Sequence, residues 1–283
     1  MPPLGPPDSA WIDWGGDGPA LHLAHANGFP AGSYRSLIGQ LIPSFHVVSM
    51  EARPLWSPDD PETLRDWRPL AEDLRAELRR RGFRGVLGVG HSLGGTLTAL
   101  AASAEPELFS ALVLIDPVIF TRPHSWVWSG MQRLGQARRF PLARRARERS
   151  VHWPGRDAVR TAYRSRPTFR TWASESFEDY LAAGFVDAAD GGVRLRYPRE
   201  WEARIFEVCP PDVWRELARV RVPVLFVRGE ASDTFLRSAA RRGVRRIAGA
   251  RSIEVAGSSH FLPFERPDVV AREIVRFAAE VRS

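Results

Sequence analysis

The stretch of residues 88–96, Gly-Val-Gly-His-Ser-Leu-Gly-Gly-Thr, constrains the fold more than any other part of the chain. It follows a short apolar run and precedes the small-residue run 97–102, so it marks a turn from a buried strand into a helix. Glycines at positions 90 and 94 flank Ser92, as a turn too tight for neighbouring Cβ atoms requires. The pattern therefore predicts a serine presented at the end of a strand, in the arrangement called a nucleophile elbow.

Apolar strands and helical segments alternate on both sides of this turn. The fully apolar character of the strands indicates a parallel sheet that is covered on both faces. We therefore expect an α/β fold with a mostly parallel, doubly wound sheet. Residues 15–19 are interpreted as a hairpin-type turn between the first two strands. The expected strands are 10–14, 20–26, 45–50, 86–89, 111–115, 223–227 and 251–255, and the expected helices are 33–41, 61–81, 96–104, 234–242 and 266–281.

The alternation stops over residues 118–219. This segment shows no clear buried strand, holds six of the ten tryptophans and contains dense arginine runs. Helical periodicity is visible near 156–165 and 175–184. The sequence thus predicts a core of residues 1–117 and 220–283 and a helical cap of residues 118–219. Residues 1–9 are expected to be a flexible leader.

The composition excludes several classes of function. All forty basic residues are arginine, so neither a Schiff-base lysine nor the lysine of a phosphate-binding loop is present. Such an arginine-only load is typical of a GC-rich genome. No spacing of cysteine, histidine or carboxylate residues suggests a metal site. The arginine runs come without a nucleic-acid-binding motif. We expect no cofactor, no metal and no nucleic-acid partner.

The same composition indicates the compartment. The single Cys209 excludes an intramolecular disulfide and fits a reducing cytoplasm. No apolar run reaches the 18 residues that a membrane span needs, and the proline-rich start lacks a signal-peptide core. A cytoplasmic protein acting on a small molecule is expected.

Four predicted strand ends carry residues with chemical potential, and they are Asn27-Gly28-Phe29, Ser92, Asp233 and His260. In a parallel sheet, chemistry collects at the carboxyl ends of the strands. A serine hydroxyl needs a histidine to accept its proton and an acid to orient that histidine. The chain order Ser, Asp, His is the order found in α/β-hydrolases.

These motifs resemble the α/β-hydrolase superfamily, and in particular its esterase, epoxide-hydrolase and lactonase-like branch with a helical cap. The resemblance covers residues 10–117 and 220–281. It implies Ser92 as nucleophile, His260 as base and Asp233 as acid. An epoxide hydrolase or dehalogenase would carry aspartate at the position of Ser92, which disfavours those chemistries.

The acid has a rival in Asp116, which follows the strand after the elbow helix. Some members of the superfamily place their acid there. Asp233 is preferred because its Gly-Glu-x-x-Asp loop fits better, and Asp116 before Pro117 is also compatible with a structural cap.

The resemblance also implies an oxyanion hole formed by the amides of Phe29 and Leu93. Asparagine stands at position 27, where the family usually has histidine, and an alternative registration puts His25 in that role. A further set of residues is expected to line the substrate pocket: Asn27, Gly28, His91, Trp126 and Trp128.

The resulting hypothesis is a serine hydrolase that cleaves an ester, thioester or lactone of a small to medium, largely apolar molecule. Carbon–carbon bond hydrolysis or cofactor-free perhydrolysis could use the same three residues. A ligand-binding receptor that kept the fold without turnover is an alternative of another class. Substrate identity and oligomeric state are left open.

Overall fold

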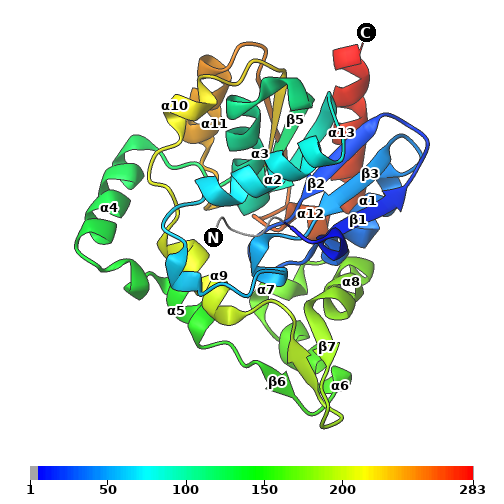
Figure 1. Cartoon of the computed structure of the whole chain (residues 1–283), viewed down its shortest axis with the longest axis vertical. Helices are drawn as coiled ribbons and strands as arrows, with labels where there is room; N and C mark the ends of the chain where they lie inside the picture. Colours follow the sequence, from blue (N-terminus) through cyan, green and yellow to red (C-terminus); the bar gives the residue numbers. More distant parts are fainter. Residues whose placement is uncertain (1–5, 283) are drawn as a thin grey trace.

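The computed structural model describes residues 6–282 and shows a seven-stranded main sheet (Figure 1). The strand order is β1-β3-β2-β4-β5-β9-β10, with β1 antiparallel to β3 and the other neighbours parallel. This confirms the predicted α/β class. The strands are β1 (Trp11–Gly15), β2 (Ala20–Ala24), β3 (His46–Met50), β4 (Val86–His91), β5 (Phe109–Ile115), β9 (Val224–Gly229) and β10 (Arg251–Val255).

Helices cover both faces of this sheet because its strands are apolar on both sides. In β5, Leu112 and Leu114 belong to one buried cluster, and Val113 and Ile115 belong to the other. The first cluster is covered by α2 (Arg68–Arg80), α3 (Leu93–Ala104) and α11 (Arg237–Arg246). The second is covered by α1 (Arg35–Leu41) and α13 (Pro267–Arg282), which α12 (Leu262–Glu265) precedes.

The segment between β5 and β9 contains most of the remaining elements, drawn in green and yellow in Figure 1. The predicted helices near 156–165 and 175–184 are confirmed. The expectation of a strand-free segment is wrong, because β6-β8-β7 form a small antiparallel sheet. These strands have only two or three residues, too few to show an alternation. The elements are α4 (Arg122–Arg133), α5 (Pro141–Arg147), β6 (His152–Trp153), α6 (Arg156–Arg164), α7 (Pro167–Arg170), α8 (Ser174–Gly184), β7 (Phe185–Asp187), β8 (Val193–Leu195), α9 (Arg199–Glu207) and α10 (Trp214–Leu217).

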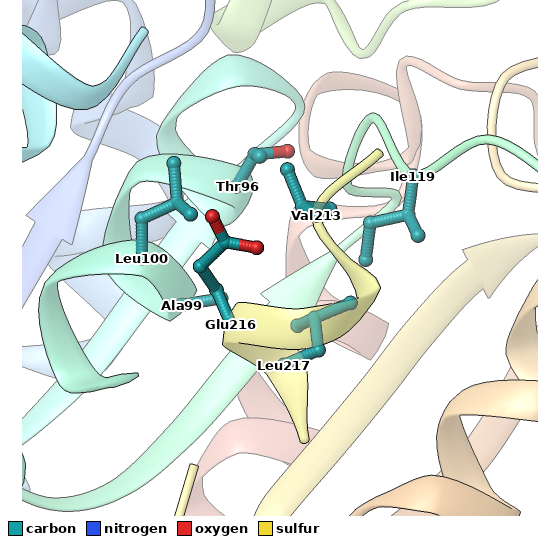
Figure 2. A pocket seen from close by; sticks show the side chains of 7 residues that line it. All are labelled: Thr96, Ala99, Leu100, Ile119, Val213, Glu216 and Leu217. Carbon is teal, nitrogen blue, oxygen red and sulfur yellow. The ribbon is translucent and has the colours of Figure 1, made fainter. Parts of the chain in front are cut away.

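The last helix of this segment, α10, packs on the core. Figure 2 shows Val213 and Leu217 facing Thr96, Ala99 and Leu100 of α3. The space between them is too narrow for a water molecule. The end of the proposed cap is therefore part of the same apolar cluster as the elbow helix.

Two other sequence predictions are corrected near the amino terminus. The first two strands do not form a hairpin, because β1 pairs with β3 while β2 lies on the other side of β3. The glycines between β1 and β2 serve a close approach instead: a Cβ on Gly16 would lie 2.0 Å from the carbonyl oxygen of Phe45. The predicted helix 61–81 begins only at Arg68, after a single 3-10 turn at Pro61–Thr63.

The predicted flexible leader lies partly outside the described residues, which begin at residue 6. The part within them includes a 3-10 turn, Asp8–Ala10. The carboxylate of Asp8 accepts hydrogen bonds from Arg80 at 2.6 Å and Arg81 at 2.8 Å. This end of the leader is thus attached to the end of α2.

Candidate active site

Ser92 stands between β4 and α3 with a positive φ of 55°, which is rare for a residue other than glycine. The neighbouring glycines make the turn possible. A Cβ on Gly90 would lie 2.4 Å from the carbonyl oxygen of Gly94, and one on Gly94 would lie 2.1 Å from that of Ala24. The predicted strand–turn–helix arrangement is therefore present, and it holds the serine at the carboxyl edge of the sheet.

The structure brings Ser92 and His260 together and adds Asp116. His260, in the loop after β10, places Nε2 3.0 Å from Ser92 Oγ and Nδ1 2.7 Å from Asp116 Oδ2. A carboxylate can only accept, so Nδ1 carries the proton and Nε2 is free to accept from the serine hydroxyl. The three side chains thus form one hydrogen-bonded row.

Asp116 is fully buried at the end of β5. Besides His260, its carboxylate accepts from the Ser232 hydroxyl at 2.5 Å and the Gly229 amide at 3.2 Å. Its own amide donates to the Val227 carbonyl at 2.7 Å. These donors compensate for the loss of water around a buried carboxylate.

The expectation that Asp233 contacts His260 is wrong. Asp233 is exposed, and its carboxylate meets the Thr234 hydroxyl at 3.4 Å. The loop after β9 turns Ser232 inward toward Asp116 and leaves Asp233 in solvent. The signal that identifies Asp116 is its position directly after a continuous apolar strand that neighbours the elbow strand.

The loop after β2 holds the predicted oxyanion residue Phe29. Its amide donates to the Ala26 carbonyl at 3.2 Å, a long bond, while the same carbonyl accepts from His25 Nδ1 at 2.8 Å. His25 Nε2 accepts from the Ala52 amide at 2.9 Å, so both its ring nitrogens are bonded within the protein, and the alternative registration on His25 stays a prediction. Leu93 is the first residue of α3, where an amide has no helical acceptor. Phe29 and Leu93 stay predictions.

Asn27 and Gly28, predicted to line the pocket, contact the segment around α9 instead. The Asn27 amide donates to the Glu202 carbonyl at 2.9 Å, and its side-chain oxygen accepts from the Tyr197 hydroxyl at 3.0 Å. A Cβ on Gly28 would lie 2.9 Å from the Glu202 carboxylate, which is paired with Arg149. Both ends of the Asn27 side chain are therefore engaged within the protein.

His91 also has no nitrogen left for a substrate. Its Nε2 lies 2.9 Å from the His260 carbonyl, so it must donate there. The Tyr34 hydroxyl then donates to His91 Nδ1 at 2.7 Å and accepts from the Ala26 amide at 3.1 Å. Burial, with the charge of His260 as a second cause, holds the pKa of His91 well below its usual range. This network joins the loop after β2, the elbow and the loop of His260.

The chain is similar to known proteins in sequence and in structure. Residues 23–273 match the model of the "Alpha/beta hydrolase family". The chain belongs to the α/β-hydrolase family.

Two curated relatives span almost the whole chain. It is 24% identical to the 2-(acetamidomethylene)succinate hydrolase of Mesorhizobium japonicum over 93% of this chain and 88% of the relative. It is also 24% identical to the soluble epoxide hydrolase of a Corynebacterium species, over 94% and 92%. A crystal structure of E-2-(acetamidomethylene)succinate hydrolase superimposes with a TM-score of 0.78 at 21% identity, covering 95% of this chain and 94% of that one. This last likeness shows the shared fold.

In this α/β-hydrolase the two predicted pocket tryptophans lie elsewhere. Trp126 is 74% exposed on α4. Trp128 is buried, packs on Phe120 and Phe140, and donates to the Cys209 carbonyl at 2.8 Å. Helix α4 thus turns Trp126 outward and Trp128 into its own packing interface.

The aromatic residues that do adjoin His260 come from other segments. The Phe261 ring meets the His260 ring edge-on, with 5.3 Å between the centroids, and contacts Phe29 at 5.7 Å and Trp172 at 5.7 Å. Phe264 completes this aromatic wall against Trp172 at 4.1 Å. Phe261 could have been found from its place directly after His260, whereas nothing local marks Trp172.

Within residues 6–282 no group of three or more histidine, cysteine or carboxylate residues is arranged to hold a metal ion. No helix in that range is long and apolar enough to cross a membrane.

Proposed function

We propose that this protein is a serine hydrolase that cleaves an ester, thioester or lactone through an acyl-enzyme. The observation that carries the proposal is the unbroken row Asp116–His260–Ser92, with 2.7 Å and 3.0 Å between the hydrogen-bonded atoms. Residues 118–219 are proposed as the cap over it. Hydrogen-bonded serine, histidine and carboxylate in this geometry are what activates a hydroxyl that is otherwise a weak nucleophile.

The chemistry follows from the protonation states that the hydrogen bonds set. Ser92 Oγ attacks the substrate carbonyl while His260 Nε2 takes its proton. Buried Asp116 holds Nδ1–H and stabilises the imidazolium that forms. His260 then gives the proton to the leaving group. In the second half, His260 Nε2 takes a proton from a water molecule that attacks the acyl carbonyl, and it returns this proton to Ser92 Oγ as the acyl–oxygen bond breaks and the acid leaves.

The developing oxyanion is assigned to the amides of Phe29 and Leu93, each worth about 3–4 kcal/mol in the transition state. The Ala26 carbonyl keeps its 2.8 Å bond to His25 when the Phe29 amide turns from it to the substrate. Because His25 still donates to this carbonyl, turning the Phe29 amide toward the substrate costs less free energy.

The half-buried rings of Phe29 and Phe261, which pack on the buried Trp172 and Phe264, support a largely apolar substrate. Aromatic rings beside the base offer dispersion contacts and little hydrogen bonding. The likeness to an epoxide hydrolase does not transfer its chemistry, since Ser92 stands where that reaction needs aspartate.

A second candidate is hydrolysis of an amide of the acetamido type. It is favoured by the likeness to 2-(acetamidomethylene)succinate hydrolase, which extends over 93% of the chain. The same three residues would serve, because acyl transfer from nitrogen and from oxygen pass through similar tetrahedral intermediates. Product analysis with matched p-nitrophenyl acetate and p-nitroacetanilide separates the two.

The test uses a fluorophosphonate probe and p-nitrophenyl esters of two to eight carbons. Ser92→Ala should abolish labelling and lower kcat by about 10⁴-fold or more. Ser103→Ala, at a hydroxyl that only donates to the Leu100 carbonyl of its own helix, is the matched control and should label normally. Labelling that persists in Ser92→Ala would overturn the proposal.

A further inference from the structure

The positive charge of this protein is concentrated in two segments. Residues 122–150 and 237–251 contain fourteen of the forty arginines and one of the thirty-three carboxylates. They carry a net charge of +13, so the remainder is at −6 within a total of +7. A genome that favours arginine would spread it through the chain. The concentration of arginine in these two segments therefore indicates a role for the positive charge at those places.

The second segment borders a hollow in the protein surface. The hollow has a volume of about 560 Å³ and lies between α11 and the edge strand β10. Small-molecule sites fall in the range of roughly 300–1,000 Å³. Four arginines and one carboxylate line it, namely Arg228, Arg237, Arg241, Arg245 and Glu254.

The single carboxylate of the hollow is already fully used. Glu254 is paired with both Arg237 and Arg228, and these guanidinium groups lower its pKa to about 2. Within residues 6–282, no carboxylate pairs with Arg241 or Arg245. The hollow thus has an excess charge of +3, and two of its cations lack an anion.

The neighbouring arginines make this excess costly. Burial and then the charges of Arg122, Arg246 and Arg245 lower the pKa of Arg242, the next residue along α11. Like charges four residues apart on a helix, such as Arg241 and Arg245, repel each other. A bound anion would relieve this repulsion.

The spacing of the arginines indicates the shape of that anion. Arg237, Arg241 and Arg245 follow each other at intervals of four residues, so they form a row along α11 with steps of about 6 Å. A single carboxylate or phosphate spans at most two neighbouring arginines of this row. A chain of phosphates offers anionic oxygens along a line, and guanidinium groups bind such oxygens in pairs.

We propose that the hollow between α11 and β10 binds an oligophosphate, a small molecule with two or three linked phosphates. No aromatic side chain lines the hollow, which disfavours single-stranded nucleic acid because its bases need rings to stack on. The site is separate from the candidate active site and does not depend on the proposed function.

The hollow is nevertheless connected to the triad through two residues. Arg228 donates to the Ser232 carbonyl at 3.1 Å, and the Ser232 hydroxyl donates to Asp116. An anion that draws Arg228 or Arg237 from Glu254 acts on the loop that holds the acid. This coupling, unlike the binding itself, rests on the proposed function: binding should change kcat measured with p-nitrophenyl acetate.

The experiment is calorimetric titration of the full chain with sodium tripolyphosphate in 50 mM NaCl and EDTA. Arg241→Ser/Arg245→Ser should lower the affinity by about tenfold or more, because the variant loses the charged hydrogen bonds of both side chains to the anion. The matched control is Arg272→Ser/Arg276→Ser, an exposed pair with the same spacing on α13. It should bind like the wild type, and 300 mM NaCl should weaken all binding.

Other probes decide the class of ligand. ATP should bind like tripolyphosphate, and inorganic phosphate at least about tenfold more weakly, because it meets fewer arginines of the row and carries less charge. Absence of wild-type binding at 1 mM, or an equal loss in the control, overturns the proposal. Tighter binding of a twenty-residue oligothymidine through the same arginines overturns it in favour of nucleic acid. If the double variant does not fold, Arg245→Ser alone should show a smaller loss in the same direction.

Discussion

The ends of β5 and β9 offer a direct comparison, because these strands are parallel neighbours and each is followed by an aspartate. Asp116 after β5 is fully buried and accepts from His260, Ser232 and Gly229. Asp233 after β9 is exposed and has one long contact, to Thr234. The loop after β9 therefore contributes to the site through its donors and not through its acid.

The two histidines at the site repeat this contrast. The rings of His91 and His260 lie 5.0 Å apart. His91 has both nitrogens bonded within the protein, whereas His260 keeps Nε2 on Ser92. Position at the strand ends brings candidates of the same type together, and the hydrogen bonds then separate the proposed base, His260, from His91, whose ring is bonded within the protein.

The largest expected effect tests the contrast between Asp116 and Asp233. Asp116→Asn should lower kcat for p-nitrophenyl acetate by about 10⁴-fold, because the carboxylate that fixes the His260 tautomer is lost. Asp233→Asn should stay within about twofold of wild type, as expected for an exposed surface substitution. A larger loss in Asp233→Asn than in Asp116→Asn would reverse the assignment of the acid.

A smaller effect is expected from the donors to Asp116. Ser232→Ala removes the hydroxyl that lies 2.5 Å from its carboxylate, and kcat should fall by about tenfold. Thr234→Val in the same loop removes the hydroxyl that touches Asp233 and is the matched control. Equal kcat values in the two variants would show that the loop does not act through Asp116.

The contrast between the histidines is tested through Tyr34. Tyr34→Phe keeps the ring packed on Phe264 but removes the donor to His91, and kcat should fall by about threefold to tenfold, as expected when one hydrogen bond of about 1 kcal/mol is lost. Tyr163→Phe, which removes a hydroxyl that accepts from Arg149, is the control for loss of a buried hydroxyl.

Nitrogen-15 spectra of the histidines measure the protonation state of His91 directly. Because the pKa of His91 lies well below its usual range, its ring should remain neutral with the proton on Nε2 from pH 5.5 to 9. Titration of His91 within that range, or a proton on Nδ1, would contradict the hydrogen-bond assignment.

The smallest expected effect concerns His22, a buried histidine away from the site, and it affects only the stability of the fold. His22 is buried in β2, its ring nitrogens meet no partner within residues 6–282, and burial lowers its pKa to about 3. As the pH falls below about 6.5, the unfolded chain binds a proton at this position before the folded one does. The free energy of unfolding should therefore drop by about 1.4 kcal/mol per pH unit until the folded pKa is reached.

Urea denaturation of His22→Leu at pH 7 and pH 5 measures this contribution. The substitution should reduce the acid-induced loss between the two pH values by about 2 kcal/mol, whatever its effect at pH 7. His124→Leu, at an exposed position on α4, should leave the loss unchanged. Equal losses in His22→Leu and the wild type would exclude a buried neutral His22.

The structure is easiest to predict from the sequence where the type of a residue depends only on its neighbours along the chain. The elbow was predictable because Gly90, Ser92 and Gly94 are the residue types that one tight turn requires, and those close approaches are present. The α/β class followed from apolar strands such as 111–115, whose alternate residues enter two different cores.

Sequence fails where the outcome depends on long-range contacts. The residues around position 232 do not indicate that the Ser232 hydroxyl points inward and the Asp233 carboxylate does not. That orientation depends on the position of Asp116, which lies 116 residues away in the sequence. The pairing of β1 with β3 likewise depends on distant strands. Trp126 and Trp128 lie two positions apart on α4 and so point to different sides of it, but which of the two is buried depends on the packing of α4.

The two hydrogen bonds of Asn27 to Tyr197 and Glu202 have one more consequence. They make the loop after β2 mechanically continuous with the segment around α9. Any motion that lifts residues 197–202 to admit a substrate must break these bonds or carry the Phe29 amide with it. Entry to the site and readiness of the proposed oxyanion donor are thus linked through a single asparagine, the one asparagine of the whole chain.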